Sequence, residues 1–153
     1  MKSLLNILKK TELPEVLKPD SAVVDWLTQL GIDQDTIRIL SECSFTCGVQ
    51  VNRIYIHQFN ALKTENLDEQ SSQCLENGFL IIGIGLNGDP IIMSLENLCV
   101  GYASHDELWE EEEYQIEEII EMTKLDICEF FLNAFDDNFP TAAFELYDQL
   151  NEN

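Results

Sequence analysis

Apolar residues recur every three or four positions in the first third of the chain, which is the period of an amphipathic helix. The segment 4–8 predicts a short helix. A second helix is expected after Asp20 or Ser21, either of which can cap its first turn, and Gly31 is expected to end it. A third helix is expected after Asp33. The second and third helices are therefore predicted to form a helical hairpin.

The pattern changes in the middle of the chain, where apolar residues alternate or run continuously. Residues 49–56 alternate with period two and predict one strand, whereas residues 63–73 are polar and are typical of a loop. Two β-branched runs then flank the pair Asn87-Gly88, which is a strong hairpin signal. An antiparallel meander of three strands is expected, near residues 79–84, 90–95 and 98–102.

Helical periodicity returns near the end of the chain. The pattern Thr123-x-x-Asp126 resembles a capping box and predicts a helix over residues 125–135. Pro140 suits the first turn of a last helix, whose apolar positions are expected to face the core. Those positions are Phe144, Tyr147 and Leu150. Residues 110–122 fit either a helix or a strand.

The order of helices, strands and helices predicts an α+β fold in a single domain spanning residues 1–153, with helices packed on an antiparallel sheet. The helical N-terminal part is expected over residues 1–45, the sheet over residues 49–104 and the C-terminal helices over residues 110–150. A length of 153 residues and a hydrophobic content of 45% suit one globular domain that needs no disulfide or metal to fold.

Charge separates the last third of the chain from the rest. The chain carries 8 basic and 29 acidic residues, a formal net charge of −21. Residues 1–20 have a net charge of +1, residues 21–100 of −7, and residues 101–153 of −15, with one lysine against 16 acidic residues. We expect no binding to nucleic acid or to an anionic membrane, because phosphate contacts require clustered Lys and Arg. A basic protein is the partner that this charge favours.

The cysteines and histidines indicate neither a metal site nor an enzyme. Five cysteines, without a secretory signal or a transmembrane run, favour free thiols and a cytoplasmic location. Cys43 and Cys47 lack the second pair of ligands that zinc requires. His57 is expected either at the surface or at the end of a strand, and His105 is expected to be hydrogen-bonded in a turn. Ser104-His105-Asp106 is no triad, because triad residues come from distant positions of the chain.

No cofactor is expected. The glycines from Gly83 to Gly88 match the G-x-G-x-x-G pattern of dinucleotide-binding loops. Such a loop must open a helix, so that the helix N-terminus faces the pyrophosphate. Here Asp89-Pro90 and a strand pattern follow, which predicts a hairpin instead.

The densest acidic run also contains aromatic residues, and it is the candidate partner-binding surface. Aromatic rings among carboxylates can hold Arg and Lys side chains by charge and by stacking. The alternative is a solvated charged loop whose Trp packs inward. The candidate residues are Tyr102, Asp106, Glu107, Trp109, Glu110, Glu111, Glu112, Glu113 and Tyr114.

The segment GFLIIGIGLNGDPIIMSLENLCVGYASHD, residues 78–106, resembles the core of the SUKH superfamily. Its members typically show an apolar strand ending in Gly, a Gly-containing hairpin, a return strand and a third strand ending near a His. They close with a helix of the type S-F-x-x-F-L, in whose place residues 123–132 stand, with Thr123 instead of Ser.

The resemblance implies an α+β domain that acts by binding and has no catalytic motif. It implies one of two functions, an immunity protein that neutralises a bacterial toxin, often a nuclease, or a regulatory scaffold module. An immunity protein is the favoured hypothesis, because an acidic protein can occupy the basic surface with which a nuclease holds phosphate. The regulatory module is the alternative, and a small hydrolase ranks far below both.

Overall fold

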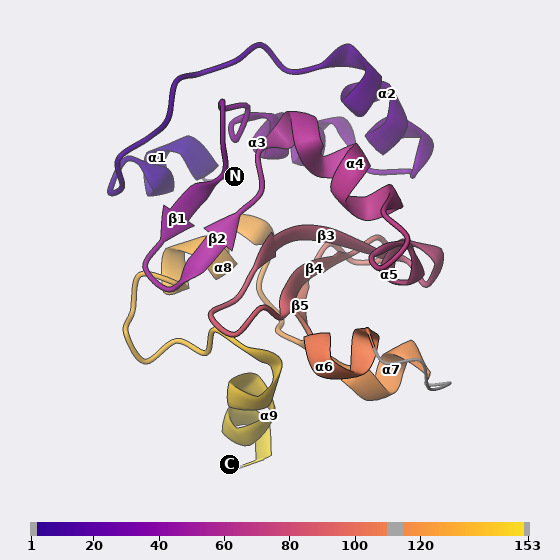
Figure 1. The fold of residues 1–153 in the computed structure, drawn as a ribbon. Coiled ribbons are helices and arrows are strands. Elements are labelled where there is room, and N and C mark those ends of the chain that lie inside the picture. Colours follow the sequence, from indigo (N-terminus) through magenta and orange to yellow (C-terminus); the bar gives the residue numbers. More distant parts are fainter. Residues whose placement is uncertain (1–2, 110–114, 152–153) are drawn as a thin grey trace.

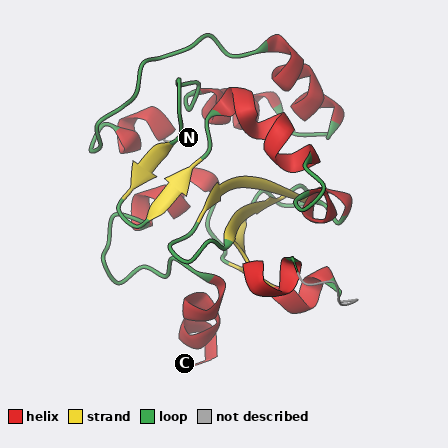
Figure 2. Cartoon of the chain, in the orientation of Figure 1, coloured by secondary structure: helices red, strands yellow, loops and turns green. Residues whose placement is uncertain are grey.

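The computed structural model describes residues 3–109 and 115–151, and it has an α+β fold (Figures 1 and 2). The sheet has six strands in the order β1-β2-β3-β4-β5-β6, so every strand pairs antiparallel with its neighbours in sequence. The strands are β1 (Val49–Val51), β2 (Ile54–Ile56), β3 (Phe79–Ile84), β4 (Pro90–Ser94), β5 (Val100–Ala103) and β6 (Ile120–Met122). The helices of the described residues are α1 (Leu4–Leu8), α2 (Ser21–Gln29), α3 (Gln34–Ser41), α4 (Leu62–Leu67), α5 (Ser72–Glu76), α6 (His105–Leu108), α7 (Ile116–Ile119), α8 (Ile127–Asn133) and α9 (Ala143–Asn151), with a 3-10 turn at Phe59–Ala61.

Both faces of the central strands are buried, which explains why their sequences are continuously apolar. Along β3, Leu80 and Ile82 belong to a large core that also contains the apolar faces of α1, α2, α3 and α8. Ile81 belongs to a smaller core on the other face, with residues of α5, α6 and α7. Successive side chains of a strand point to opposite faces, so one run of isoleucines serves both cores.

The predicted meander is confirmed, and the hairpin turn lies where the Asn-Gly pair predicts it. β3 pairs with β4, and β4 pairs with β5, in antiparallel register. Gly88 has a φ of 101°, a conformation that residues with a side chain rarely adopt. Glycine at this position therefore suits the turn that joins β3 to β4.

The single strand predicted over residues 49–56 is wrong, because the segment is a hairpin of β1 and β2. Asn52 has a φ of 50° and Arg53 completes the two-residue turn. Val51 pairs with Ile54, so the buried positions are spaced by three residues across the turn. Buried residues alternate with more exposed ones in both strands, and the alternation shifts by one residue at the turn.

The loop predicted over residues 63–73 is also wrong, because α4 and the start of α5 lie in it. Asn66 is fully buried in α4, and its side chain bonds the backbone of β3. Its Nδ2 donates to the Ile81 carbonyl at 2.8 Å, and its Oδ1 accepts from the Ile81 amide at 2.7 Å. The strand β2 is too short to pair along all of β3, and Asn66 satisfies part of the remaining edge.

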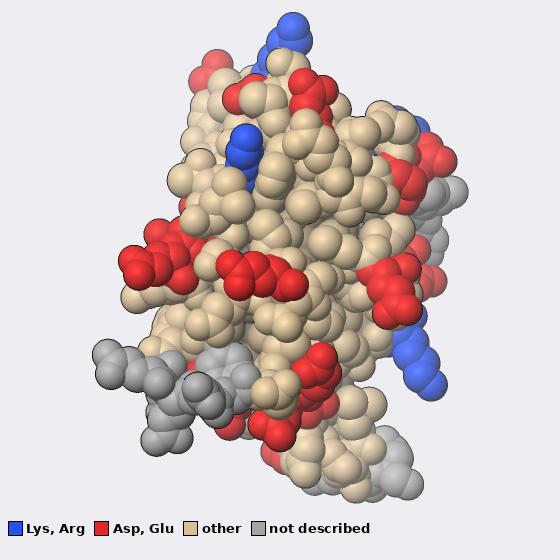
Figure 3. Space-filling model, turned by 90° about the vertical axis from the view of Figure 1, so that its right-hand side faces the viewer, with Lys and Arg blue, Asp and Glu red and all other residues tan. Residues whose placement is uncertain are grey.

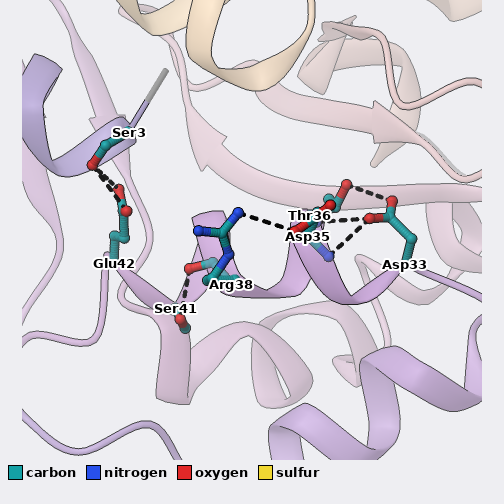
Figure 4. A network of polar contacts seen from close by, with 7 residues as sticks. All are labelled: Ser3, Asp33, Asp35, Thr36, Arg38, Ser41 and Glu42. Carbon is teal, nitrogen blue, oxygen red and sulfur yellow. Dashed lines mark hydrogen bonds and ion pairs between the residues drawn. The ribbon is translucent and has the colours of Figure 1, made fainter. Parts of the chain in front are cut away.

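The N-terminal helices have the predicted caps. The Asp20 side chain accepts from the Ala22 amide, and Asp33 accepts from the amides of Asp35 and Thr36. The hydrogen bonds from Thr36 and Asp35 lower the pKa of the Asp33 carboxyl, and the largest contribution comes from the Thr36 hydroxyl. Figure 4 shows this cap together with a contact at the other end of α3. There Glu42 accepts a hydrogen bond from the Ser3 hydroxyl at 2.9 Å, which ties α1 to α3.

The C-terminal part differs from its prediction in three places. β6 extends the sheet beyond residue 104, within the stretch that fits either a helix or a strand. The capping box predicted at Thr123 and Asp126 is formed by Asp126 and Glu129, and Asp126 is the N-cap of α8. The Thr123 hydroxyl donates to the Val100 carbonyl of β5. The last helix, α9, begins at Ala143 and buries Ala143 and Leu146. The stripe predicted to face the core is exposed: its residues are Phe144, Tyr147 and Leu150.

Candidate functional site

A buried carboxylate joins three segments that are far apart in the sequence. Asp89 follows the β3–β4 turn and is 2% exposed. Its Oδ1 accepts from the backbone amide of His105 at 2.9 Å and lies 2.7 Å from the His105 Nδ1. Its Oδ2 accepts from the Ala143 amide at 2.7 Å. Asp89 therefore holds the hairpin, the start of α6 and the start of α9 together.

The His105 ring lies between two carboxylates. Its Nδ1 faces Asp89, and its Nε2 lies 3.0 Å from Oδ1 of Asp106, whose side chain is largely exposed. The ring also meets the Trp109 ring edge-on, with centroids 5.7 Å apart. A histidine base needs one nitrogen directed at a nucleophile. Here both nitrogens face carboxylates, so the geometry suits a clamp that positions Asp106 and Trp109.

A groove of about 440 Å³ opens beside His105 and Asp89, between α6, the α7–β6 segment and α9. We call it the acidic groove, and define it by Asp106, Glu107, Glu118, Glu121, Phe144 and Tyr147. None of its described lining residues is Lys or Arg. Partial burial raises the pKa of the Glu121 carboxyl, because the charged form loses solvent. A cationic group in the groove would offset that loss.

The wall that α9 contributes is apolar and exposed. Phe144 is 59% exposed and Tyr147 is 53% exposed, and Leu150 continues the stripe at 55%. These residues are three positions apart, so they lie on one side of the helix. We call them the α9 stripe. On the face drawn in Figure 3, most of the charged side chains in the middle and lower parts are acidic, among a surface made mainly of other residues.

The residues predicted to bind a partner fall in different places. Asp106 and Glu107 line the acidic groove, and Trp109 is 48% exposed in a neighbouring groove. Residues 110–114, the rest of the acidic run, lie outside the described residues.

Tyr102 is corrected from a surface residue to a core residue. It is fully buried, and its hydroxyl donates to the Pro140 carbonyl at 2.8 Å. Burial raises the pKa of its phenol. Its alternation within β5 directs the ring into the large core, against Phe130. It offers no surface to a partner.

His57 lies at the end of a strand, which is one of the two expected positions, and it is buried rather than at the surface. It directly follows β2, where its ring meets the Tyr55 ring edge-on. Burial lowers the pKa of its imidazole, against a smaller opposing effect of the Glu65 charge. The histidine predicted in a turn, His105, is instead the first residue of α6 and makes the contacts described above.

The sequence reasoning missed four residues of the acidic groove: Glu118, Glu121, Phe144 and Tyr147. Glu118 and Glu121 belong to residues 110–122, whose sequence fits either a helix or a strand. The two aromatic residues were assigned to the core by their spacing.

The described residues contain no group of three or more His, Cys, Asp or Glu side chains that could hold a metal ion. All five cysteines are free thiols. Burial raises the pKa of the Cys43 and Cys74 thiols to about 12, which disfavours the thiolate that binds metals or attacks substrates. Over the described ranges, no helix is both long and apolar enough to cross a membrane.

No family model matches the chain, and no curated protein matches it.

Proposed function

We propose that this protein works by binding a basic protein through the acidic groove and the α9 stripe. One observation carries the proposal, which is that four carboxylates besides the buried Asp89 line a groove whose other wall holds the exposed rings of Phe144 and Tyr147. Charge alone gives fast but weak association, whereas buried aromatic side chains supply most of the energy of an interface. The two kinds of residue together make a surface suited to Arg- and Lys-rich partners.

The partner that we favour is a bacterial toxin domain with a basic active surface, such as a nuclease, and the protein would then be its immunity protein. The resemblance of residues 78–106 to the SUKH superfamily supports this choice. The carboxylates of the groove would lie where the toxin holds phosphate. The net charge of −21 would speed capture of a basic toxin, because long-range attraction raises association rates.

A non-catalytic regulatory module is the alternative, with a cellular protein as its partner. It would use the same surface, so the gene neighbourhood distinguishes the two. A neighbouring gene that encodes a large toxin with a basic C-terminal domain favours the immunity protein. A neighbourhood of housekeeping genes without a toxin favours the module.

The test is protection of bacteria that express the C-terminal domain of the neighbouring toxin. The wild-type protein should restore growth. The exposed groove residues Glu107 and Glu118 are then both replaced by Lys, which should abolish protection while the circular dichroism spectrum stays unchanged. Glu12 and Glu96, exposed acids outside the lining of the groove, are replaced by Lys as the matched control, which should still protect. Full protection by the groove variant would refute the proposal.

A further inference from the structure

A second groove lies near His105, whose ring contacts one of its lining residues, Trp109. Its volume is about 390 Å³, and it lies between α4, the turn that follows α4 and the β3–β4 hairpin. We call it the Trp109 groove, and define it by Thr64, Glu65, Asp68, Ile84, Pro90 and Trp109. The two grooves have no lining residue in common.

The ring of Trp109 is held in place from one side. The His105 ring meets it edge-on at an interplanar angle of 70°, and His105 is itself fixed by Asp89. Trp109 is nevertheless 48% exposed, although most tryptophans of folded proteins are largely buried. A ring that is held on one side and half open to solvent can accept a flat group against the part of its surface that stays free.

The remaining walls have the chemistry that complements an arginine. Glu65 and Asp68 are exposed carboxylates, and the side chain of Ile84 is 36% exposed. None of the described lining residues of this groove is basic. A guanidinium can stack on an indole and bond to carboxylates at the same time, while its methylene stem covers apolar surface. A lysine ammonium lacks the planar face and the fork of donors.

We infer that the Trp109 groove is a second subsite for an arginine side chain of the same basic partner. The inference rests on the proposed function and deepens it. Gly88 of the Trp109 groove lies beside the imidazole of His105, and the chain neighbours of His105, Ser104 and Asp106, line the acidic groove, so the partner would present basic side chains to both grooves. Two separated charged contacts fix the orientation of the partner, which one groove cannot do.

The test uses Nα-acetyl-arginine amide as the probe, followed by nitrogen-15 NMR of the whole protein. The indole N–H of Trp109 reports the Trp109 groove. The indole N–H of Trp26, which is 8% exposed in α2, is an internal reference. The amides of Glu118 and Tyr147 report the acidic groove separately. Saturable movement of the Trp109 signal, with the Trp26 signal unchanged, is the expected result.

Two controls isolate the chemistry. Nα-acetyl-citrulline amide has nearly the same shape without the charge, and it should leave the Trp109 signal in place. Replacing Glu65 by Gln and Asp68 by Asn should weaken arginine binding at Trp109 at least about fivefold. The matched change of Glu12 and Glu96 to Gln should not.

The outcomes separate the two proposals. If the Trp109 signal does not move, or moves equally with citrulline, the second subsite is wrong, whatever the acidic groove does. The proposed function is judged by the growth assay, where the Glu107 and Glu118 variant is decisive. The protein can therefore protect bacteria in the growth assay without binding arginine at Trp109, or bind arginine at Trp109 without protecting bacteria.

Discussion

The helices α2 and α9 are both nine residues long and amphipathic, yet they use their apolar residues in opposite ways. α2 buries Val23, Trp26 and Leu27 in the large core. α9 buries only Ala143 and Leu146, and its larger apolar side chains face solvent. A periodic pattern predicts a helix and a stripe, but which side of the helix meets the core depends on where the chain places it.

The Asp89 carboxylate helps to place α9. The Asp89 carboxylate accepts from the amide of Ala143, the first residue of the helix. α9 also contacts β5 and β6, and its buried residues Ala143 and Leu146 belong to the large core. The α9 stripe is surface that folding leaves unburied, which is why we propose it as an interaction site.

The largest effect on stability is expected from a leucine-to-alanine substitution, made once in α2 and once in α9. Leu27→Ala in α2 should lower the free energy of unfolding by about 2 to 5 kcal/mol, because it removes a fully buried side chain and leaves a cavity. Leu150→Ala in α9 should change it by less than about 0.5 kcal/mol, because this side chain is already half exposed. Chemical denaturation measures both. Equal losses would show that the α9 stripe is part of the core.

The second effect concerns the residue that holds α9. Asp89→Asn replaces a carboxylate oxygen with an amide that cannot accept, so a buried donor loses its partner. The free energy of unfolding is expected to fall by about 3 kcal/mol. Asp106→Asn is the control, because Asp106 contacts the same imidazole from the exposed side and should cost less than about 1 kcal/mol. If both substitutions cost the same in thermal denaturation, Asp89 is not the clamp.

The third effect depends on pH. Burial lowers the pKa of His57 in the folded protein, so the unfolded chain binds a proton that the folded chain resists. Its contribution to stability is therefore complete above the ordinary histidine pKa of about 6.5 and is lost as the pH falls below it. His57→Gln should lose less stability than the wild type between about pH 7.5 and 5. Parallel pH profiles for the two proteins would contradict the buried, neutral histidine.

The smallest effect is expected in the acidic groove. Burial raises the pKa of Glu121, so the folded protein disfavours the charged carboxylate and loses stability as the pH rises through the carboxyl range. Glu121→Gln should raise the melting temperature at neutral pH by no more than about 2 °C, and the gain should vanish near pH 3, where the wild-type carboxyl is protonated. A lower melting temperature at neutral pH would refute this.

Local signals in the sequence predicted the parts of the fold that local chemistry decides. Asn87-Gly88 predicted the hairpin, and Asp20 and Asp33 predicted the starts of α2 and α3. The β1–β2 turn was missed, because Asn52-Arg53 interrupts the alternation by a single residue. α4 was missed because its apolar residues are few, and its buried Asn66 bonds a strand 15 residues away.

The candidate site was predicted only in part, because its residues meet through long-range contacts. Asp106 and Glu107 were found from the density of charge around them. Asp89 was not, since its partners lie 16 and 54 residues further along the chain. That bond is one of the long-range contacts that orient α9, so the exposure of Phe144 and Tyr147 could not be derived from their spacing.

The central claim is that the α9 stripe is a binding anchor, and the dissociation rate of the neighbouring toxin domain tests it most directly. In surface-plasmon resonance, replacing Phe144 and Tyr147 by Ala should raise the dissociation rate at least about tenfold and leave the association rate nearly unchanged. Val16→Ala, at a position that is 71% exposed outside the acidic groove, is the control and should change neither rate. An unchanged dissociation rate in the folded double variant would contradict the claim.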